Sequence, residues 1–314
     1  MTRPADQQTV AVVVVTYNRA VLLVGMLDGL AAQTRPADAI IVIDNASTDH
    51  TRKVLDARLD EGILPLVITT TEDNLGGAGG FHLGMLQAYD AGHDRILLMD
   101  DDVVPAPDFL EVMAAHDGPC QMAVREDRQG RLVEKAAIRF DLDNPLAIKP
   151  KTASVDSTYA DRASMPAEVR VENVAFEGFM VRRDVIAAVG LPDPSFFIFY
   201  DDVDFALRAQ RAGFEIVCLR DAVLVRQLDF DQQHALDTWK GFYMYRNLFV
   251  VHFRYGSNVL VRLKPWLIVL MVVLLAPLRG GRREAANVIK AIRSARHMRA
   301  LSPASSPSAL ISHR

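Results

Sequence analysis

Three consecutive aspartates, Asp100, Asp101 and Asp102, are the residues of this sequence best suited to chemistry. In an extended chain successive side chains point to opposite sides, so Asp100 and Asp102 would share one direction while Asp101 points away. Two carboxylates on one side provide the hard oxygen ligands that Mg²⁺ and Mn²⁺ prefer. A solvated acidic loop is the alternative. However, residues 95–99 (RILLM), directly before the triplet, are typical of a buried strand, and the ends of such strands bind ligands.

A glycine-rich segment at residues 74–80 (NLGGAGG) is the second feature. Glycines let a backbone approach a ligand or another element closely, so this segment could line a binding site. No Lys-Ser or Lys-Thr pair follows it, which argues against a P-loop NTPase, and its spacing differs from that of a dinucleotide-binding loop. A flexible turn without function is the alternative.

Asp201, Asp202 and Asp204 form a third acidic group, which follows the aromatic residues 196–200 (FFIFY) and begins a predicted helix from about residue 202 to 213. Aspartates at a helix start can cap it and complement the helix dipole, which could explain one or two of the three. A carboxylate beside an aromatic wall also suits a general base that deprotonates a hydroxyl group. The spacing alone does not decide between these interpretations.

The elements that would position these residues alternate between strand and helix over the first 100 residues. Buried strands are expected at residues 10–15, 39–43, 64–69 and 95–99, and helices at residues 20–32, after residue 49 and near 81–91. This alternation predicts an α/β fold with a parallel sheet and right-handed crossovers. The polar loops at residues 16–19, 44–49 and 100–102 would meet at the carboxyl edge of that sheet, where such folds bind ligands. Between residues 117 and 171 the pattern weakens, which predicts irregular strands and a mobile loop.

The charge of the chain is unevenly distributed. The 314 residues carry a formal net charge of −4, but residues 258–314 hold ten Lys or Arg and one acidic residue, Glu284, a net charge of +9. The other residues therefore carry −13. The basic segment also contains a strongly apolar run, and this combination favours an anionic membrane surface over nucleic acid as a partner.

Two features predict that the protein stays on the cytoplasmic side of the membrane. Cys120 and Cys218 lie far apart and form no CxxC pair, so we expect neither a disulfide framework nor a structural zinc site, and a reducing compartment fits. The first ten residues (MTRPADQQTV) lack the basic-then-apolar pattern of a secretory signal.

The apolar run covers residues 266–278 (WLIVLMVVLLAPL), with Pro265 directly before it and Pro277 near its end. A membrane-spanning helix needs roughly 20 residues, so this run of 13 is too short to cross comfortably. Basic residues then recur partly on one helical face of residues 283–299. We expect a peripheral or re-entrant membrane anchor, with a buried core helix or an oligomer contact as alternatives.

The order of the motifs resembles that of family 2 inverting glycosyltransferases with the GT-A fold. The motifs are TYNR at residues 16–19, DNASTD at 44–49, NLGGAGGF at 74–81, MDDD at 99–102 and FFIFYDDVDFALRAQRAG at 196–213. The resemblance covers about residues 10–225, and the motifs are specific as a set. Within the family, NLGGAGGF, MDDD and YDDVDF look most like the actinobacterial galactofuranosyltransferases. The length and the basic tail look like the enzyme that initiates cell-wall galactan.

The resemblance implies a mostly parallel, Rossmann-like sheet flanked by helices, and it implies an activity. Galactofuranose would pass from UDP-galactofuranose to a rhamnosyl-N-acetylglucosamine on a polyprenyl diphosphate, at the cytoplasmic face of the cell membrane. Residues 1–235 would form the catalytic domain, with a nucleotide-binding part at 1–115 and an acceptor part at 116–235. Residues 236–314 would form a helical, basic region that associates with the membrane as a peripheral anchor.

The resemblance also assigns roles to single residues. Asp202 would be the general base, and Asp201 would orient donor or acceptor hydroxyl groups. Asp100 and Asp102 would hold a divalent metal, Mn²⁺ or Mg²⁺, together with the diphosphate. The residues expected to bind the nucleotide sugar are Thr16, Arg19, Asp44, Asn74, Gly76, Gly77 and Asp101.

One position departs from the family pattern. The family commonly has a metal-binding histidine about two dozen residues after the base, whereas residues 222–227 (AVLVRQ) contain none. Arg226 could contact the diphosphate directly, or His234 could be the third metal ligand.

Three other interpretations compete with this one. A rhamnosyltransferase would use dTDP-rhamnose on a lipid-linked acceptor, but it usually has a different glycine segment. A sugar nucleotidyltransferase also has an acidic metal site, but it generally carries a glycine-rich, basic loop after the first strand, where this chain has TYNRA. An inactive membrane-bound scaffold would explain the missing histidine but not the retained acidic motifs.

Overall fold

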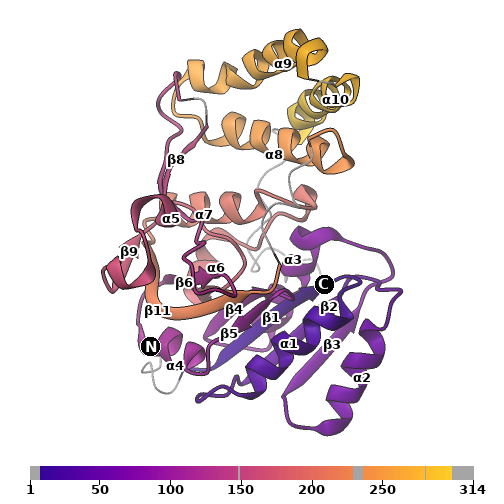
Figure 1. Ribbon diagram of the computed structural model, residues 1–314, viewed down its shortest axis with the longest axis vertical. Helices are drawn as coiled ribbons and strands as arrows, with labels where there is room; N and C mark the ends of the chain where they lie inside the picture. Colours follow the sequence, from indigo (N-terminus) through magenta and orange to yellow (C-terminus); the bar gives the residue numbers. More distant parts are fainter. Residues whose placement is uncertain (1–7, 148, 229–235, 280, 299–314) are drawn as a thin grey trace.

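The computed structural model describes residues 8–147, 149–228, 236–279 and 281–298, and its centre is a mixed sheet (Figure 1). The valine- and isoleucine-rich runs form its first four strands, β1 (Val10–Thr16), β2 (Ala39–Asp44), β3 (Leu66–Thr70) and β4 (Arg95–Asp100). These strands pair in parallel in the order β3-β2-β1-β4. Every residue of β1 and β2 is buried, as expected for parallel strands that are covered on both faces.

The other half of the sheet comes from the chain beyond residue 100. β10 (Phe179–Arg182) pairs antiparallel with β4 and with β6 (Cys120–Glu126), and β6 pairs in parallel with β11 (Ile216–Arg226). Two short strands, β5 (Val103–Pro105) and β9 (Glu168–Arg170), pair antiparallel with β11. Within the described residues, six of these nine strands run in one direction, which confirms the predicted mostly parallel α/β sheet.

Helices cover both faces of the sheet (Figure 1). The even-numbered residues of β1 face a core formed with α1 (Ala20–Ala31), α2 (Thr51–Glu61) and α4 (Phe109–Ala115). The odd-numbered residues face a second core, formed with α3 (Gly76–Asp90), α6 (Arg183–Val189) and α7 (Asp201–Arg211). Because side chains alternate along a strand, a continuous apolar run supplies both cores.

The structure differs from the sequence-based expectation in two places. α3 begins at Gly76, so the glycine-rich segment forms the first turns of this helix rather than a loop before it. The segment between residues 117 and 171, expected to be irregular, contributes the buried strand β6 and a two-stranded sheet of β7 (Ala137–Phe140) and β8 (Lys151–Ser154), followed by α5 (Val155–Thr158). β6 escapes the apolar pattern because it carries the buried polar residues Gln121 and Arg125.

Three helices of the C-terminal region form a layer at the top of Figure 1, namely α8 (Trp239–Tyr255), α9 (Val259–Arg279) and α10 (Arg282–Met298). They share a hydrophobic core that includes Phe249, Val272 and Ile292. Ala78 of α3 and Phe196 belong to the same core. The helical layer is therefore packed directly onto the elements that begin at the carboxyl edge of the sheet.

α9 is longer than the apolar run in the sequence suggests. It spans 21 residues and continues through both Pro265 and Pro277. The expectation of a segment too short to cross a bilayer was therefore wrong, because the helix is long and apolar enough by composition to do so. Only 22% of its most apolar window, Val259–Ala276, is buried inside the structure.

Candidate active site

A cavity of about 400 Å³ opens where β1 and β4 end. Its walls come from the loops after these strands and from the starts of α3 and α7. The predicted site residues that line it are Thr16, Arg19, Asn74, Gly76, Gly77, Asp100, Asp101, Asp102, Asp201 and Asp202. Asp44 does not line this cavity, and His234 lies outside the described residues.

Asp101 is turned toward the end of β1. Its carboxylate accepts a hydrogen bond from Thr16 Oγ1 at 2.7 Å and forms an ion pair with Arg19 at 3.3 Å. The same Arg19 nitrogen contacts Asp102 Oδ2 at 2.7 Å. Burial raises the pKa of Asp101 to about 6, against the opposing effects of Arg19 and Thr16. Arg19 thus holds the acidic turn together, a role that the resemblance to nucleotide-binding motifs does not imply.

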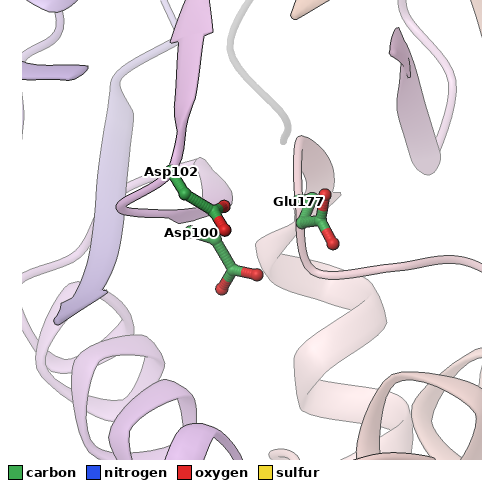
Figure 2. Close-up of side chains that lie close together, drawn as sticks. All are labelled: Asp100, Asp102 and Glu177. Carbon is green, nitrogen blue, oxygen red and sulfur yellow. The ribbon is translucent and has the colours of Figure 1, made fainter. Parts of the chain in front are cut away.

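Asp100 and Asp102 converge on a third carboxylate, Glu177, which lies just before β10 (Figure 2). One oxygen atom of each residue lies within 4.8 Å of those of the other two. Residues 101 and 102 form a turn between β4 and β5, so a turn, and not strand alternation, brings Asp100 and Asp102 together. Burial and the three neighbouring carboxylates raise the pKa of Asp100 well above its ordinary value.

This carboxylate cluster has the chemistry of a divalent-cation site. Mg²⁺ and Mn²⁺ prefer carboxylate oxygens, and their charge would offset the repulsion that raises the pKa of Asp100. Asp102 Oδ1 is buried and has no hydrogen-bond partner among the described residues. A buried polar atom of this kind is costly unless something satisfies it. The three residues therefore fit a bound divalent cation.

Glu177 was not predicted from the sequence, and two arginines hold it in place. Arg125 and Arg226 contact Glu177 Oε2 at 2.6 and 3.2 Å. Burial would raise the pKa of Glu177, but these two guanidinium groups outweigh it and lower the pKa. Arg226 therefore faces a carboxylate of the cluster. A single acidic residue inside the apolar stretch AFEGF was the only local signal for Glu177.

The three aspartates of α7 have different surroundings. Asp204 is fully buried and binds Arg208 at 3.0 Å, Arg254 at 3.1 Å and the Tyr255 hydroxyl group at 2.7 Å, so its role is structural.

Asp201 and Asp202 instead line the cavity. None of the three occupies the N-cap position, which belongs to Tyr200. N-capping therefore does not account for Asp201 or Asp202. Both lie in the first turn of the helix, where a carboxylate complements the helix dipole, and Asp202 Oδ1 accepts a hydrogen bond from the Val203 backbone at 2.7 Å.

Burial changes the acidity of both cavity-lining aspartates. It raises the pKa of Asp202 to about 6, against a backbone hydrogen bond from Val203 and the charge of Lys151. Burial and the neighbouring Asp202 raise the pKa of Asp201 well above its ordinary value. A carboxyl group whose pKa lies just below neutrality can accept a proton during a reaction near pH 7. Asp202 has this property.

The loop before α7 is strained, and α8 holds it. Phe197, Phe199 and Tyr200 have φ angles of 63–66°, a left-handed conformation that costs on the order of 1–3 kcal/mol for each such residue. The Asn247 side-chain amide donates to the carbonyl oxygens of residues 196, 198 and 199 at 2.7–3.0 Å. Arg246 donates to those of residues 195 and 196. These contacts fix the turn that delivers Asp201 and Asp202 to the cavity.

The first two glycines of α3 have different environments. Gly76 has a φ angle of 71°, and a Cβ atom added there would lie 2.1 Å from the carbonyl oxygen of Phe197. A Cβ atom added at Gly77 would meet nothing within 4 Å. Gly76 is therefore required for packing against the strained loop. Gly77 leaves open space at a helix start, where backbone N–H groups favour anions.

Asn74 and Asp44 shape the neighbouring wall. Asn74 Oδ1 accepts a hydrogen bond from the Gly76 backbone at 2.8 Å, which supports the start of α3. Asp44 lies at the end of β2 and is 1% exposed. Its Oδ1 atom accepts from the Ser47 backbone at 3.0 Å, and its Oδ2 atom is buried without a hydrogen-bond partner in the described part of the chain.

Several curated galactofuranosyltransferases are similar to most of this chain. The galactofuranosyltransferase GlfT1 of Mycolicibacterium smegmatis is 30% identical over 254 residues, which cover 76% of this chain and 82% of that protein. GlfT1 of Mycobacterium tuberculosis is 32% identical over 257 residues, which cover 76% of this chain and 81% of that protein. In both comparisons the aligned residues therefore cover most of this chain and most of the relative.

Solved structures share the fold at low sequence identity. GalNAc-T7 with UDP, GalNAc and Mn²⁺ superposes with a TM-score of 0.61 at 15% identity, over 80% of this chain and 48% of that one. The mannosyltransferase PcManGT from Pyrobaculum calidifontis, with GDP-Man and Mn²⁺, gives a TM-score of 0.57 at 19% identity, over 99% of this chain and 81% of that one. Both support the GT-A fold.

The family assignment follows from a match over most of the sequence. The family described as glycosyltransferase like family 2 matches residues 6–242, a range that includes every motif named above. The match contains the carboxylate cluster, the strained loop and the start of α8. The chain therefore belongs to the family 2 glycosyltransferases, as its motifs predicted.

Proposed function

We propose that this glycosyltransferase transfers galactofuranose from UDP-galactofuranose to a rhamnosyl-N-acetylglucosamine carried on a polyprenyl diphosphate, the step that initiates cell-wall galactan. The observation that carries the proposal is the relationship to the two GlfT1 proteins. Their identity of 30–32% extends over 76% of this chain and more than four-fifths of theirs. Their names as galactofuranosyltransferases support the same donor sugar here.

Asp100, Asp102 and Glu177 would hold a divalent cation, Mn²⁺ or Mg²⁺. When bound, such an ion neutralises negative charge that develops on the leaving UDP. Glu177 would supply the third ligand in place of the family's usual histidine. Arg226 is 4% exposed and paired with Glu177, which supports a positioning role over direct contact with the diphosphate. The assignment of His234 as a ligand stays a prediction from the sequence.

The donor nucleotide would lie along the wall between β1 and α3. Thr16, Asn74 and Gly77 line this part of the cavity, and the open space at Gly77 leaves room for the donor beside the helix start. Asp44 does not line this cavity, so its contact with the nucleotide stays a prediction from the sequence. Arg19 and Asp101 would belong to the nucleotide site and act by shaping the acidic turn.

Asp202 is the proposed general base for an inverting transfer. Its carboxylate takes the proton from the attacking acceptor hydroxyl group as the new bond forms to the anomeric carbon. The bond from that carbon to the diphosphate oxygen breaks, and UDP leaves. Because this is a single in-line displacement, the anomeric configuration is inverted. Asp201, beside the base, would orient a hydroxyl group of donor or acceptor.

The helical layer would hold the enzyme on the cytoplasmic face of the membrane. Exposed leucines of α9 recur every three or four positions, at Leu260, Leu263, Leu267, Leu270 and Leu274. Four other exposed apolar residues of this helix widen the same face, namely Val259, Trp266, Met271 and Val273. Exposed basic residues of α10 lie nearby, and the Arg296 guanidinium group lies 5.6 Å from the Trp266 ring centre. One apolar stripe flanked by arginines favours a helix that lies in the membrane surface over one that spans it.

A donor panel tests the proposed function. The purified full chain receives a synthetic rhamnosyl-N-acetylglucosaminyl diphosphate lipid with UDP-galactofuranose, dTDP-rhamnose or UDP-glucose, and both nucleotide release and product mass are measured. Only UDP-galactofuranose should give a product one hexose heavier. Transfer from dTDP-rhamnose would favour the rhamnosyltransferase. Release of inorganic diphosphate from a nucleoside triphosphate and a sugar phosphate would instead identify a nucleotidyltransferase.

A further inference from the structure

A second cavity, of about 620 Å³, adjoins the donor cavity. Asp202, Glu177, Ala175 and Phe199 line both of them. The proposed base therefore stands at the junction of the two cavities. A hydroxyl group held in the second cavity could reach Asp202 while a nucleotide sugar occupies the first, which is the geometry that a two-substrate displacement needs.

Three lysines give the second cavity a positively charged wall, and they come from the segment that contains β7 and β8. Lys135 pairs with Asp156 at 2.6 Å, and the Lys151 ammonium group donates to the carbonyl oxygen of Lys135 at 2.6 Å. Lys149 is exposed and forms no ion pair with any residue that the structure describes. Two of the three lysines thus carry positive charge that no described carboxylate pairs with directly.

The position of Lys151 connects this wall to the reaction centre. Part of the side chain is open to solvent, but desolvation by the cavity walls lowers the pKa of its ammonium group. The charge of the Asp202 carboxylate opposes this lowering. Lys151 and Asp202 line the same cavity, so Lys151 lies within electrostatic reach of the proposed base, and an anion bound beside Lys151 would occupy the cavity that also receives the acceptor hydroxyl group.

The second cavity also has an apolar wall, formed by Met244 and Leu248 of α8 with Phe140 and Val203. Met244 and Leu248 are four residues apart, so they lie on the same face of the helix, and both are half-buried. A ligand that matches this cavity combines an anionic group with an apolar chain.

We propose that the second cavity binds the diphosphate of a lipid-linked acceptor, with Lys149 and Lys151 as its main contacts and the start of the lipid chain against Met244 and Leu248. This inference rests on the proposed function and names the subsite that selects its acceptor. Ammonium groups bind diphosphate oxygens by charge-assisted hydrogen bonds and need no metal. The donor diphosphate would bind elsewhere, in the first cavity near Asp100 and Asp102. These carboxylates repel an anion, so the donor diphosphate needs a bound cation there.

Hydrogen bonds connect the loop before this subsite to α9, the helix proposed to contact the membrane. The Lys264 ammonium group at the start of α9 donates to the carbonyl oxygens of Asn144 and Ala147 at 2.5 and 3.0 Å. Asn258 donates to that of Asp143 at 2.7 Å. These bonds anchor the loop that leads into Lys149 and Lys151, and Figure 1 shows this loop rising from β8 to the start of α9. A lipid diphosphate in the cavity would stay close to the membrane surface.

Binding measurements on the full chain test this inference without turnover. Farnesyl diphosphate is titrated into detergent-solubilised protein that is already saturated with UDP and Mn²⁺, so that the donor cavity is filled. The double variant Lys149→Ala/Lys151→Ala should bind this probe at least tenfold more weakly than the unmodified chain. Lys53→Ala, which removes an exposed lysine of α2 that lines neither cavity, should bind it normally. The affinity for UDP should be the same in all three proteins.

Two outcomes would overturn the inference. Equal affinity of the double variant and the unmodified chain for farnesyl diphosphate would remove the lysines as contacts. Equal affinity of the unmodified chain for inorganic and farnesyl diphosphate would show a site for a free anion and remove the lipid from the proposal. A chain that binds farnesyl diphosphate as expected but does not use UDP-galactofuranose would contradict the proposed donor and leave the acceptor subsite standing.

Discussion

At the residue scale, the site gives each carboxylate a different electrostatic surrounding. Asp101 is paired with Arg19, and Glu177 is paired with Arg125, so both have a cation beside them. Asp100 is surrounded by like charges, which favours either a proton or a metal ion on it. Asp202 forms no ion pair with the described residues, and burial leaves its pKa at about 6. Carboxylates in one cavity can therefore have different proposed roles, as metal ligand, as partner of an arginine and as general base.

The raised pKa of Asp202 predicts how the rate depends on pH. A base must be ionised to accept a proton, so turnover should rise as the pH increases through about 6 and level off above it. Asp202→Asn should abolish this limb and lower kcat by roughly 10²–10⁴-fold. UDP release is measured across the pH range, with UDP affinity determined separately by titration. Unchanged turnover in the variant with intact UDP affinity would remove Asp202 as the base.

Glu177 offers a test of the metal site that does not depend on activity. Glu177→Gln removes one charged ligand and should weaken Mn²⁺ binding by at least about tenfold, since even supporting residues of metal sites have effects of 10–100-fold. Free Mn²⁺ is followed by electron paramagnetic resonance during titration of the protein. Glu134→Gln is the matched control, because Glu134 pairs with the same Arg125 but lies outside the cluster. Thermal unfolding checks that both variants are folded. Equal Mn²⁺ affinity of the two variants would exclude Glu177 as a ligand.

At the scale of elements, the sequence predicts those strands whose own residues form a continuous apolar run. Strands β1, β2 and β4 lie within a residue of their predicted bounds, because a buried parallel strand is apolar throughout. β6 could not be predicted in this way, because the burial of Arg125 depends on Glu134 and Glu177, which follow later in the chain. Glu177 was missed for the same reason. Its role depends on residues that only the folded sheet brings beside it.

The start of α3 yields a matched pair of substitutions. Gly76→Ala places a Cβ atom against the Phe197 carbonyl oxygen at a position with positive φ, so it should destabilise the protein by about 1–3 kcal/mol or more. Gly77→Ala should leave stability the same or raise it slightly, because alanine is favoured over glycine in a helix. Thermal unfolding measures both effects. In a transfer assay, Gly77→Ala should raise the KM for the UDP-sugar if the donor occupies the open space beside this residue. A stable Gly76→Ala protein would contradict the proposed contact with the strained loop.

At the scale of the whole molecule, the helical layer and the sheet domain form one working unit. Asn247 and Arg246 of α8 hold the strained loop that precedes the proposed base, and Met244 lines the second cavity. A truncation before α8 would therefore be expected to remove activity together with membrane binding. Point substitutions in the exposed stripe of α9 separate the two effects, because this stripe faces away from the shared core.

The exposed leucines of α9 should govern attachment to membranes. Burying a leucine side chain contributes roughly 1.5–3 kcal/mol, so the triple variant Leu263→Ser/Leu267→Ser/Leu270→Ser should lose at least about a hundredfold in partitioning to anionic vesicles. Leu59→Ser/Ile63→Ser/Val67→Ser, which changes three exposed apolar residues near α2 and β3, should sediment with vesicles like the unmodified chain. High salt should also weaken binding, because it screens the basic residues of α10 from anionic lipid. If alkaline carbonate failed to extract the unmodified protein, α9 would span the bilayer, as its 21 residues permit, instead of lying in its surface.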